Sequence, residues 1–242
     1  MLKITLFHLP NSRSQRIIWL LEELELPYSL IFSSDVHPDL ISDTVKPLKF
    51  PTIKIQTFSS NLASAKLVDE FYLTETSAIA EYLLTLCPNT LSVEPAHSEQ
   101  YRRYTYWKNY ADCGLMQTAA LKQTFAQITR RSPFLLRPIS YIFQYGINKL
   151  YLNDQLKLEL TKINEHLKEK TWFCGSHFSL ADIMMFFPLE ACFAMGDELI
   201  YKMDSYPHIH NYLSRLNSRQ AYAIALNSGQ WRPASFDKYW NI

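Results

Sequence analysis

Glycine and cysteine are scarce in this sequence, with five glycines and four cysteines among 242 residues. Loops that cradle phosphate groups need closely spaced glycines, and the chain contains no GxGxxG, P-loop or GxSxG motif, so nucleotide-binding and α/β-hydrolase functions lack support. The cysteines are widely scattered and form no CxxC pair, which argues against zinc and against a disulfide framework. The sequence therefore predicts a reduced, cytoplasmic protein.

An excess of one charge sign is also missing, since 24 Lys and Arg residues face 23 Asp and Glu residues. Nothing in that total supplies the positive field that nucleic acids or anionic membranes attract, so neither is expected as a partner. The first residues lack the pattern of a secretory signal, and no run approaches the roughly twenty apolar residues of a membrane span. The seven histidines form no HExxH motif and have no clustered Cys or carboxylate partners, so no metal site is predicted.

Hydrophobic periodicity predicts a compact α/β unit in the first 86 residues. Alternating apolar positions indicate strands over residues 2–8, 28–32, 50–55 and 67–73. Helical spacing follows the first strand, where Ser12 and Gln15 have the spacing of a capping box, and returns from Thr76 until just before Pro88.

A proline-bearing stretch of weak periodicity, residues 87–97, is interpreted as a linker. Beyond it the pattern is helical, with helices predicted over 98–128, 133–148, 152–170, 179–195 and 206–217. The expected organisation is an α/β domain over residues 1–86, the linker, and an all-helical domain over residues 98–242.

Four local patterns resemble cytosolic glutathione S-transferases of the serine type, in bacterial- and fungal-like form, and follow that family's order and spacing along the chain. They lie at residues 9–16, 49–53, 73–79 and 173–183. The resemblance implies a thioredoxin-like N-terminal domain followed by an all-helical domain. It also implies glutathione as co-substrate, a small hydrophobic electrophile as second substrate, no metal, and a homodimer.

The first pattern contains the hydroxyl that, by resemblance, activates glutathione. A thiol ionises near pH 8.5, and both a hydroxyl hydrogen bond and the positive end of a helix favour its thiolate. We expect Ser12 to fill this role, with Asn11 and Ser14 as alternates. The competing interpretation of Ser12 is a helix cap, and both roles can coexist.

The second and third patterns resemble the family's contacts with the glutathione tripeptide. Lys49, Phe50 and Pro51 resemble the loop before a cis-proline, where the residue before proline pairs through its backbone with the cysteinyl part. The family's usual glycine before the basic residue is missing. Glu75 and Thr76 resemble the corner that holds the γ-glutamyl ammonium and carboxylate, although both are also good capping residues.

The remaining two segments are assigned to the helical domain. Ser179 and Asp182 have the S-x-x-D spacing of a capping box and are expected to be structural. Residues 104–112 resemble the helix that lines the second-substrate pocket, which makes Tyr106, Trp107 and Tyr110 candidate lining residues. Core packing is the competing interpretation of these three aromatics.

The sequence therefore predicts a glutathione transferase acting in detoxification, whose activated thiolate attacks electrophilic carbon or the oxygen of a peroxide. One alternative is a non-catalytic protein of the same fold that holds a ligand or a partner, motivated by the missing glycine and the ambiguous serine. A thiol-disulfide reductase of related fold would need a cysteine at the start of the first helix, and residues 9–16 contain none.

Overall fold

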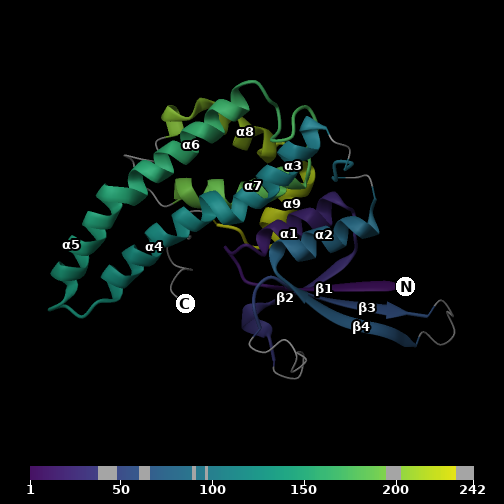
Figure 1. Cartoon of the computed structure of the whole chain (residues 1–242). Helices are drawn as coiled ribbons and strands as arrows, with labels where there is room; N and C mark the ends of the chain where they lie inside the picture. The colour runs from purple at the N-terminus through teal and green to yellow at the C-terminus, as the bar shows by residue number, and fades with distance from the viewer. Residues whose placement is uncertain (38–47, 60–65, 89–90, 96–97, 195–202, 233–242) are drawn as a thin grey trace. The chain divides into compact units, whose positions relative to one another are not determined.

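The structure is a computed structural model of the chain that describes residues 1–37, 48–59, 66–88, 91–95, 98–194 and 203–232. It contains two compact units, coloured along the chain in Figure 1. The first comprises residues 1–92 together with residues 218–232, and the second includes residues 93–217. The division by contacts thus differs from the division expected from sequence, which placed every residue from 98 onward in the helical domain.

The first unit is built on a four-stranded mixed sheet. Its strands are β1 (Leu2–His8), β2 (Tyr28–Phe32), β3 (Thr52–Phe58) and β4 (Leu67–Thr74), in the order β2-β1-β3-β4. β1 pairs parallel with β2, and the β1–β3 and β3–β4 pairs are antiparallel. Every residue from Ile4 to His8 is buried, which makes β1 the central strand of the core.

Helices α1 (Gln15–Glu23) and α2 (Thr76–Leu86) lie on one face of this sheet (Figure 1), and η1 (Ser33–Asp35) follows β2. Five consecutive α1 residues, from Ile17 to Leu21, are almost fully buried. The predicted capping box is wrong, because the Gln15 side chain donates to the Ala225 carbonyl oxygen at 2.6 Å. The Gln15 side chain therefore makes a tertiary contact with α9 and does not cap α1.

Helix α9 (Gln220–Ser228) is absent from the helices expected from sequence, and it packs against α1. Trp19 meets Tyr222 edge to face, with ring centroids 4.9 Å apart. Arg219 donates two hydrogen bonds of 2.6 Å to the nearly buried Glu23 carboxylate. Within the first unit, an aromatic contact and a bidentate ion pair thus join the segment that contains α9 to α1.

The second unit is helical. Its elements are α3 (Glu99–Tyr110), η4 (Ala111–Leu115), α4 (Met116–Arg131), α5 (Arg137–Ile147), η5 (Asn148–Leu152), α6 (Asn153–Lys168), α7 (Leu180–Ala194), η6 (Met203–Ser205) and α8 (Pro207–Asn217). The five predicted helices are present. The π turn η4 divides the first of them into α3 and α4, and the π turn η5 connects α5 to α6. Residues 180–189 of α7 are all buried, so this helix forms the centre of the unit.

Asp182 anchors the start of α7. Its carboxylate accepts hydrogen bonds from the Ser179 N–H at 2.9 Å, the Ser179 hydroxyl at 3.0 Å and the Phe173 N–H at 2.9 Å. Burial raises the pKa of this fully buried carboxyl to about 6, while the hydrogen bonds oppose that rise. The contact from carboxylate to N–H is the one expected of a capping box, and it supports a structural role for both residues.

Candidate functional site

The junction between β1 and α1 contains a short chain of side-chain hydrogen bonds. Ser12 Oγ lies 2.8 Å from Ser14 Oγ, which lies 2.7 Å from Nδ1 of His8. His8 Nε2 lies 2.9 Å from the Gly229 carbonyl oxygen just after α9. Ser14 and His8 are fully buried, whereas Ser12 is half-buried.

The Gly229 carbonyl determines where the proton of His8 lies. A carbonyl oxygen only accepts, so Nε2 must carry the proton and donate to it. Burial lowers the pKa of His8 to about 4, against the opposing effect of this hydrogen bond, so the ring is neutral at pH 7 and Nδ1 is an acceptor. Ser14 Oγ lies 2.7 Å from this buried acceptor and 3.0 Å from the Leu9 carbonyl oxygen. Because donation over the shorter contact also satisfies the buried Nδ1, the Ser14 hydroxyl donates to His8 and its proton is committed.

The Ser12 proton is not committed in this way. Ser12 Oγ can donate to the Leu9 carbonyl oxygen at 2.7 Å or to Ser14 Oγ, and it accepts the Ser14 N–H at 3.2 Å. A hydroxyl with one proton and two alternative acceptors can rotate toward a third acceptor at modest cost. Of the two serines, Ser12 is therefore the one able to donate to a ligand.

Asn11 is buried beside this network in a left-handed conformation, with φ at 53°. Its side-chain oxygen accepts a hydrogen bond of 2.6 Å from the Arg232 N–H. Its Nδ2 is buried, and the described residues offer it no partner. Asn11 thus joins two distant parts of the first unit and retains one unused donor.

The predicted cis bond is present between Phe50 and Pro51, directly before β3. The ladder between β3 and β4 begins at the pair Thr52 and Thr74, so Phe50 lies outside it. Thr52 Oγ1 donates to the Lys49 carbonyl oxygen at 2.6 Å and ties the loop to the strand. Pro51 is buried and the Lys49 side chain is exposed.

Glu75 occupies the corner between β4 and α2 with φ at 70° and ψ at 123°. A side chain other than glycine is strained there, by about 1–3 kcal/mol, and such strain concentrates at functional sites. The Glu75 side chain is exposed and makes no capping hydrogen bond, so the capping interpretation of this residue is not supported. Thr76, the first residue of α2, is buried.

In the helical unit, Tyr106 and Tyr110 line an open groove of about 750 Å³ whose other lining residues come from α3, η4, α4, η5 and α6. Their rings stack at 5.4 Å, and Lys162 Nζ lies 4.8 Å from the centroid of the Tyr106 ring. Trp107 does not line this groove. It is 3% exposed and packs against His166 and Phe173, with centroid separations of 4.5 and 4.9 Å.

Sequence reasoning missed His8 and its partner Gly229. A lone histidine at the end of an apolar strand carries no spacing signal, and its partner is 221 residues away. Among the residues that the structure describes, no group of three His, Cys, Asp or Glu side chains could hold a metal ion.

Comparison with known proteins identifies the family. The family model described as "Glutathione S-transferase, C-terminal domain" matches residues 132–220. Glutathione S-transferase 3 of Schizosaccharomyces pombe is 30% identical over 224 residues, covering 92% of this chain and 86% of that protein. A glutathione S-transferase structure from Actinobacillus pleuropneumoniae superposes with a TM-score of 0.68 at 23% identity, covering 98% of this chain and 99% of that one. A glutathione transferase family member from Pseudomonas fluorescens, solved with two glutathione bound, gives 0.67 at 20% identity and 92% coverage of both chains.

A thioredoxin-like α/β unit combined with a helical unit therefore defines the fold class, as the solved structures show. The identity to the fission yeast protein, which extends over nearly the whole chain, goes further than the fold. This chain belongs to the glutathione S-transferase family.

Proposed function

We propose that this protein is a glutathione transferase in which the Ser12 hydroxyl stabilises the glutathione thiolate. The observation that carries the proposal is the difference between the two serines of the β1–α1 junction. The Ser14 proton is committed to His8, whereas the half-buried Ser12 hydroxyl can turn its proton toward a sulfur. A hydrogen bond to the charged form of the thiol lowers its pKa and raises the fraction of nucleophile at pH 7.

The other predicted contacts fit the tripeptide. The exposed Glu75 carboxylate, free of any capping bond, suits the γ-glutamyl ammonium. The start of α2 at Thr76 suits the adjacent carboxylate, because unpaired N–H groups and the helix dipole favour an anion there. Phe50 lies outside the strand ladder, so its backbone N–H and C=O would pair with the cysteinyl part of glutathione. The exposed, charged side chain of Lys49 would also contact glutathione.

For the second substrate, the groove that contains Tyr106 and Tyr110 supports the expectation of an apolar electrophile site in the helical unit. Trp107 would act only by supporting this wall from the core. The proposed reaction is attack of the thiolate on electrophilic carbon or on a peroxide oxygen, accelerated by thiol ionisation and by the positioning of two reactants. A homodimer in the cytoplasm and a role in detoxification belong to the same proposal.

The test is the ultraviolet absorbance of bound glutathione thiolate as a function of pH. We expect a bound thiol pKa well below that of free glutathione, and a rise of about one unit, which is 1.36 kcal/mol, in Ser12→Ala. Ser176→Ala is the matched control, because Ser176 is an exposed serine of the helical unit. Assays with 1-chloro-2,4-dinitrobenzene and with cumene hydroperoxide then distinguish conjugation from peroxide reduction.

Two results would change the assignment. A rise in Asn11→Ala alone would transfer the role to the unused Nδ2 donor of Asn11. If no thiolate signal develops at any pH and the protein is not retained on immobilised glutathione, the non-catalytic alternative is the better account.

A further inference from the structure

One stretch of the helical unit departs from the balanced charge of the whole chain. From residue 113 to residue 153 the sequence contains no Asp or Glu, but it contains Lys122, Arg130, Arg131, Arg137 and Lys149. This stretch includes α4, α5 and the turn between them, which project as an antiparallel pair from the rest of their unit (Figure 1). We call residues 128–151 the arm.

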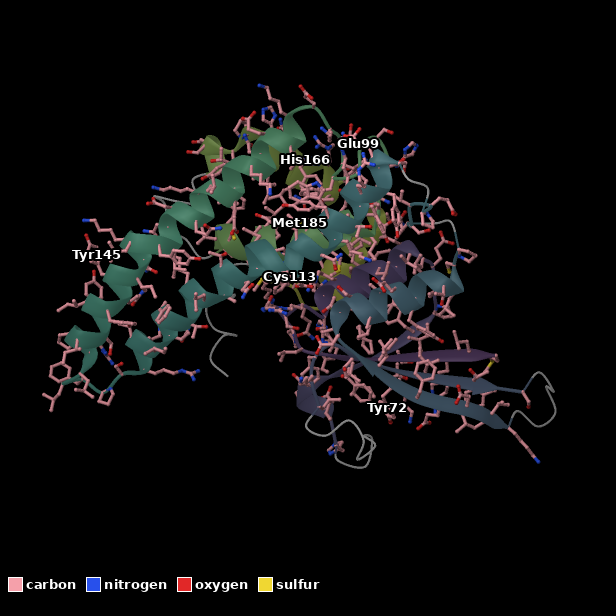
Figure 2. All side chains as sticks on the ribbon, in the orientation of Figure 1. Tyr72, Glu99, Cys113, Tyr145, His166 and Met185 are labelled. Atoms are coloured by element: carbon pink, nitrogen blue, oxygen red, sulfur yellow. The ribbon has the colours of Figure 1, made fainter. Side chains whose placement is uncertain are left out.

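The arm exposes an unusual amount of apolar surface. Helix α5 has no buried residue along its 11 positions, although most of them are apolar or aromatic. The turn before it exposes Phe134 by 81% and Leu135 by 84%. Apolar and aromatic side chains that are more than half exposed occur throughout the arm, at Ile128, Phe134, Leu135, Leu136, Ile139, Tyr141, Ile142, Phe143, Tyr145, Leu150 and Tyr151. Figure 2 shows Tyr145 on α5, out along the projecting pair.

The contacts between α4 and α5 are partly polar. Ser140 Oγ lies 2.7 Å from Ser132 Oγ, and the Ser140 carbonyl oxygen accepts a hydrogen bond from Thr129 at 3.2 Å. Phe125 and Phe143 add one edge-to-face contact at 5.7 Å. The α4–α5 contact therefore uses the hydroxyl groups of Thr129, Ser132 and Ser140 and one pair of aromatic rings. Most apolar side chains of α5 are exposed.

The spread of exposed side chains around α5 indicates what covers them. At about 100° per residue, Ile139, Tyr141, Ile142, Phe143 and Tyr145 extend over about 200° of the circumference. A helix that packs on one protein surface carries an apolar stripe on the order of 100° wide. An arc twice as wide suits a fluid apolar medium that can surround the helix better than it suits one rigid partner.

The charges of the arm point to the same partner. Arg130, Arg131, Arg137 and Lys149 are all exposed. The first two precede the turn at Phe134, Arg137 begins α5, and Lys149 follows its end. Basic residues beside apolar and aromatic side chains are the composition that binds an anionic membrane surface. Two copies meeting arm to arm would bring like charges together, which disfavours that contact.

We propose that the arm is a docking surface for an anionic phospholipid bilayer. Phe134, Leu135 and the outer face of α5 enter the boundary between headgroups and acyl chains, while the arginines and Lys149 contact the anionic headgroups. No helix in the described parts of the chain is long and apolar enough to cross a membrane, and α5, with 11 residues, is far below the roughly twenty required. The protein lies on the surface and does not span it.

The experiment is co-sedimentation of the full chain with phosphatidylcholine vesicles prepared with and without phosphatidylglycerol, at low and high salt. We expect binding to the phosphatidylglycerol vesicles that weakens as salt rises. The triple variant Arg131→Gln/Arg137→Gln/Lys149→Gln should lower the partition coefficient about 100-fold, because each basic side chain near an anionic surface contributes about fivefold.

A second variant tests the apolar part. Phe134→Asn/Leu135→Asn/Ile142→Gln should abolish sedimentation with vesicles while leaving the circular dichroism spectrum unchanged, since all three side chains are at least 70% exposed. The matched control is Leu67→Asn/Val68→Asn on β4, where two apolar side chains are 50% and 67% exposed. The control variant should sediment like the parent protein.

Three results would overturn the proposal. The first is a parent protein that stays in the supernatant with phosphatidylglycerol vesicles. The second is equal, salt-insensitive binding to both kinds of vesicle. The third is an equal loss in the β4 control. If the parent protein fails to bind and light scattering shows that the Phe134 triple variant turns a dimer into a monomer, the arm is instead an interface between copies of this chain.

Discussion

The network at the β1–α1 junction predicts a specific pH dependence of stability through His8. This ring is fully buried, and its pKa is lowered to about 4 by desolvation. In the unfolded chain the same ring titrates near 6.5. Between these two values the unfolded state binds more protons than the folded state, so stability must fall as pH is lowered from about 6.5 to about 4.

The magnitude follows from that interval. At 1.36 kcal/mol per pH unit, the separation between 6.5 and about 4 corresponds to about 3 kcal/mol of unfolding free energy. Replacement by phenylalanine removes this proton linkage and leaves the Gly229 carbonyl without its donor, at a cost of about 1–3 kcal/mol. We therefore expect His8→Phe to be less stable than the parent by that amount at pH 7.5 and to lose this difference, or reverse it, near pH 4.

The assay is urea unfolding of both proteins at several pH values between 4 and 7.5, with unfolding free energies extrapolated to water. His177→Phe is a suitable control because His177 is exposed, and its curve should run parallel to that of the parent. If the His8→Phe curve is also parallel to the parent curve over the whole range, the ring is not a neutral buried group. The assignment of the Ser14 proton would then fail with it.

Three further predictions test other parts of the structure. Burial raises the pKa of Glu190 from 4.5 to about 7, so the folded state holds more protons than the unfolded state between these values and stability falls as pH rises from 4.5 to 7. Glu190→Gln should therefore gain about 2 kcal/mol in urea unfolding at pH 8, where the loss is complete, and little at pH 4. Glu75→Gly should melt at a higher temperature than Glu75→Ala, because glycine relieves the positive φ, while both variants lose retention on immobilised glutathione. Arg219→Leu should cost about 2–3 kcal/mol in urea unfolding, because the nearly buried Glu23 carboxylate loses its cationic partner and keeps only the hydrogen bond from the Trp19 indole N–H, and Glu23→Gln in the same chain should recover part of that loss.

Strand positions could be predicted because their cause is local. The apolar residues over 2–8 and 28–32 predict β1 and β2 with the bounds that the structure has, although burial along β1 is continuous from Ile4 to His8 and does not alternate. The corner at Glu75 could be located from its place between a strand and a helix. The strained φ of Glu75 could not be predicted, because a glutamate side chain gives no indication of a positive φ.

The hydroxyl network was beyond sequence analysis for a different reason. Ser12 and Ser14 are two residues apart and both suit a helix start, so spacing alone could not rank them. Their difference arises from His8, whose tautomer depends on the Gly229 carbonyl, 221 residues further along the chain. Sequence reasoning also missed α9, which positions that carbonyl. Without knowledge of this helix, the tautomer of His8 could not be assigned.

The arm illustrates how a total conceals a local arrangement. A chain with 24 basic and 23 acidic residues gave no reason to expect an anionic surface as partner. The screening length is about 8 Å at physiological salt, however, so the distribution of charge within one element decides its partner and the sum over the chain does not. With no acidic residue between positions 113 and 153, the arm carries only positive charge over a distance longer than this screening length. The apolar side chains of the arm could not be recognised from the sequence either. Their spacing is compatible with a packed helix, and only the structure shows that α5 buries none of them.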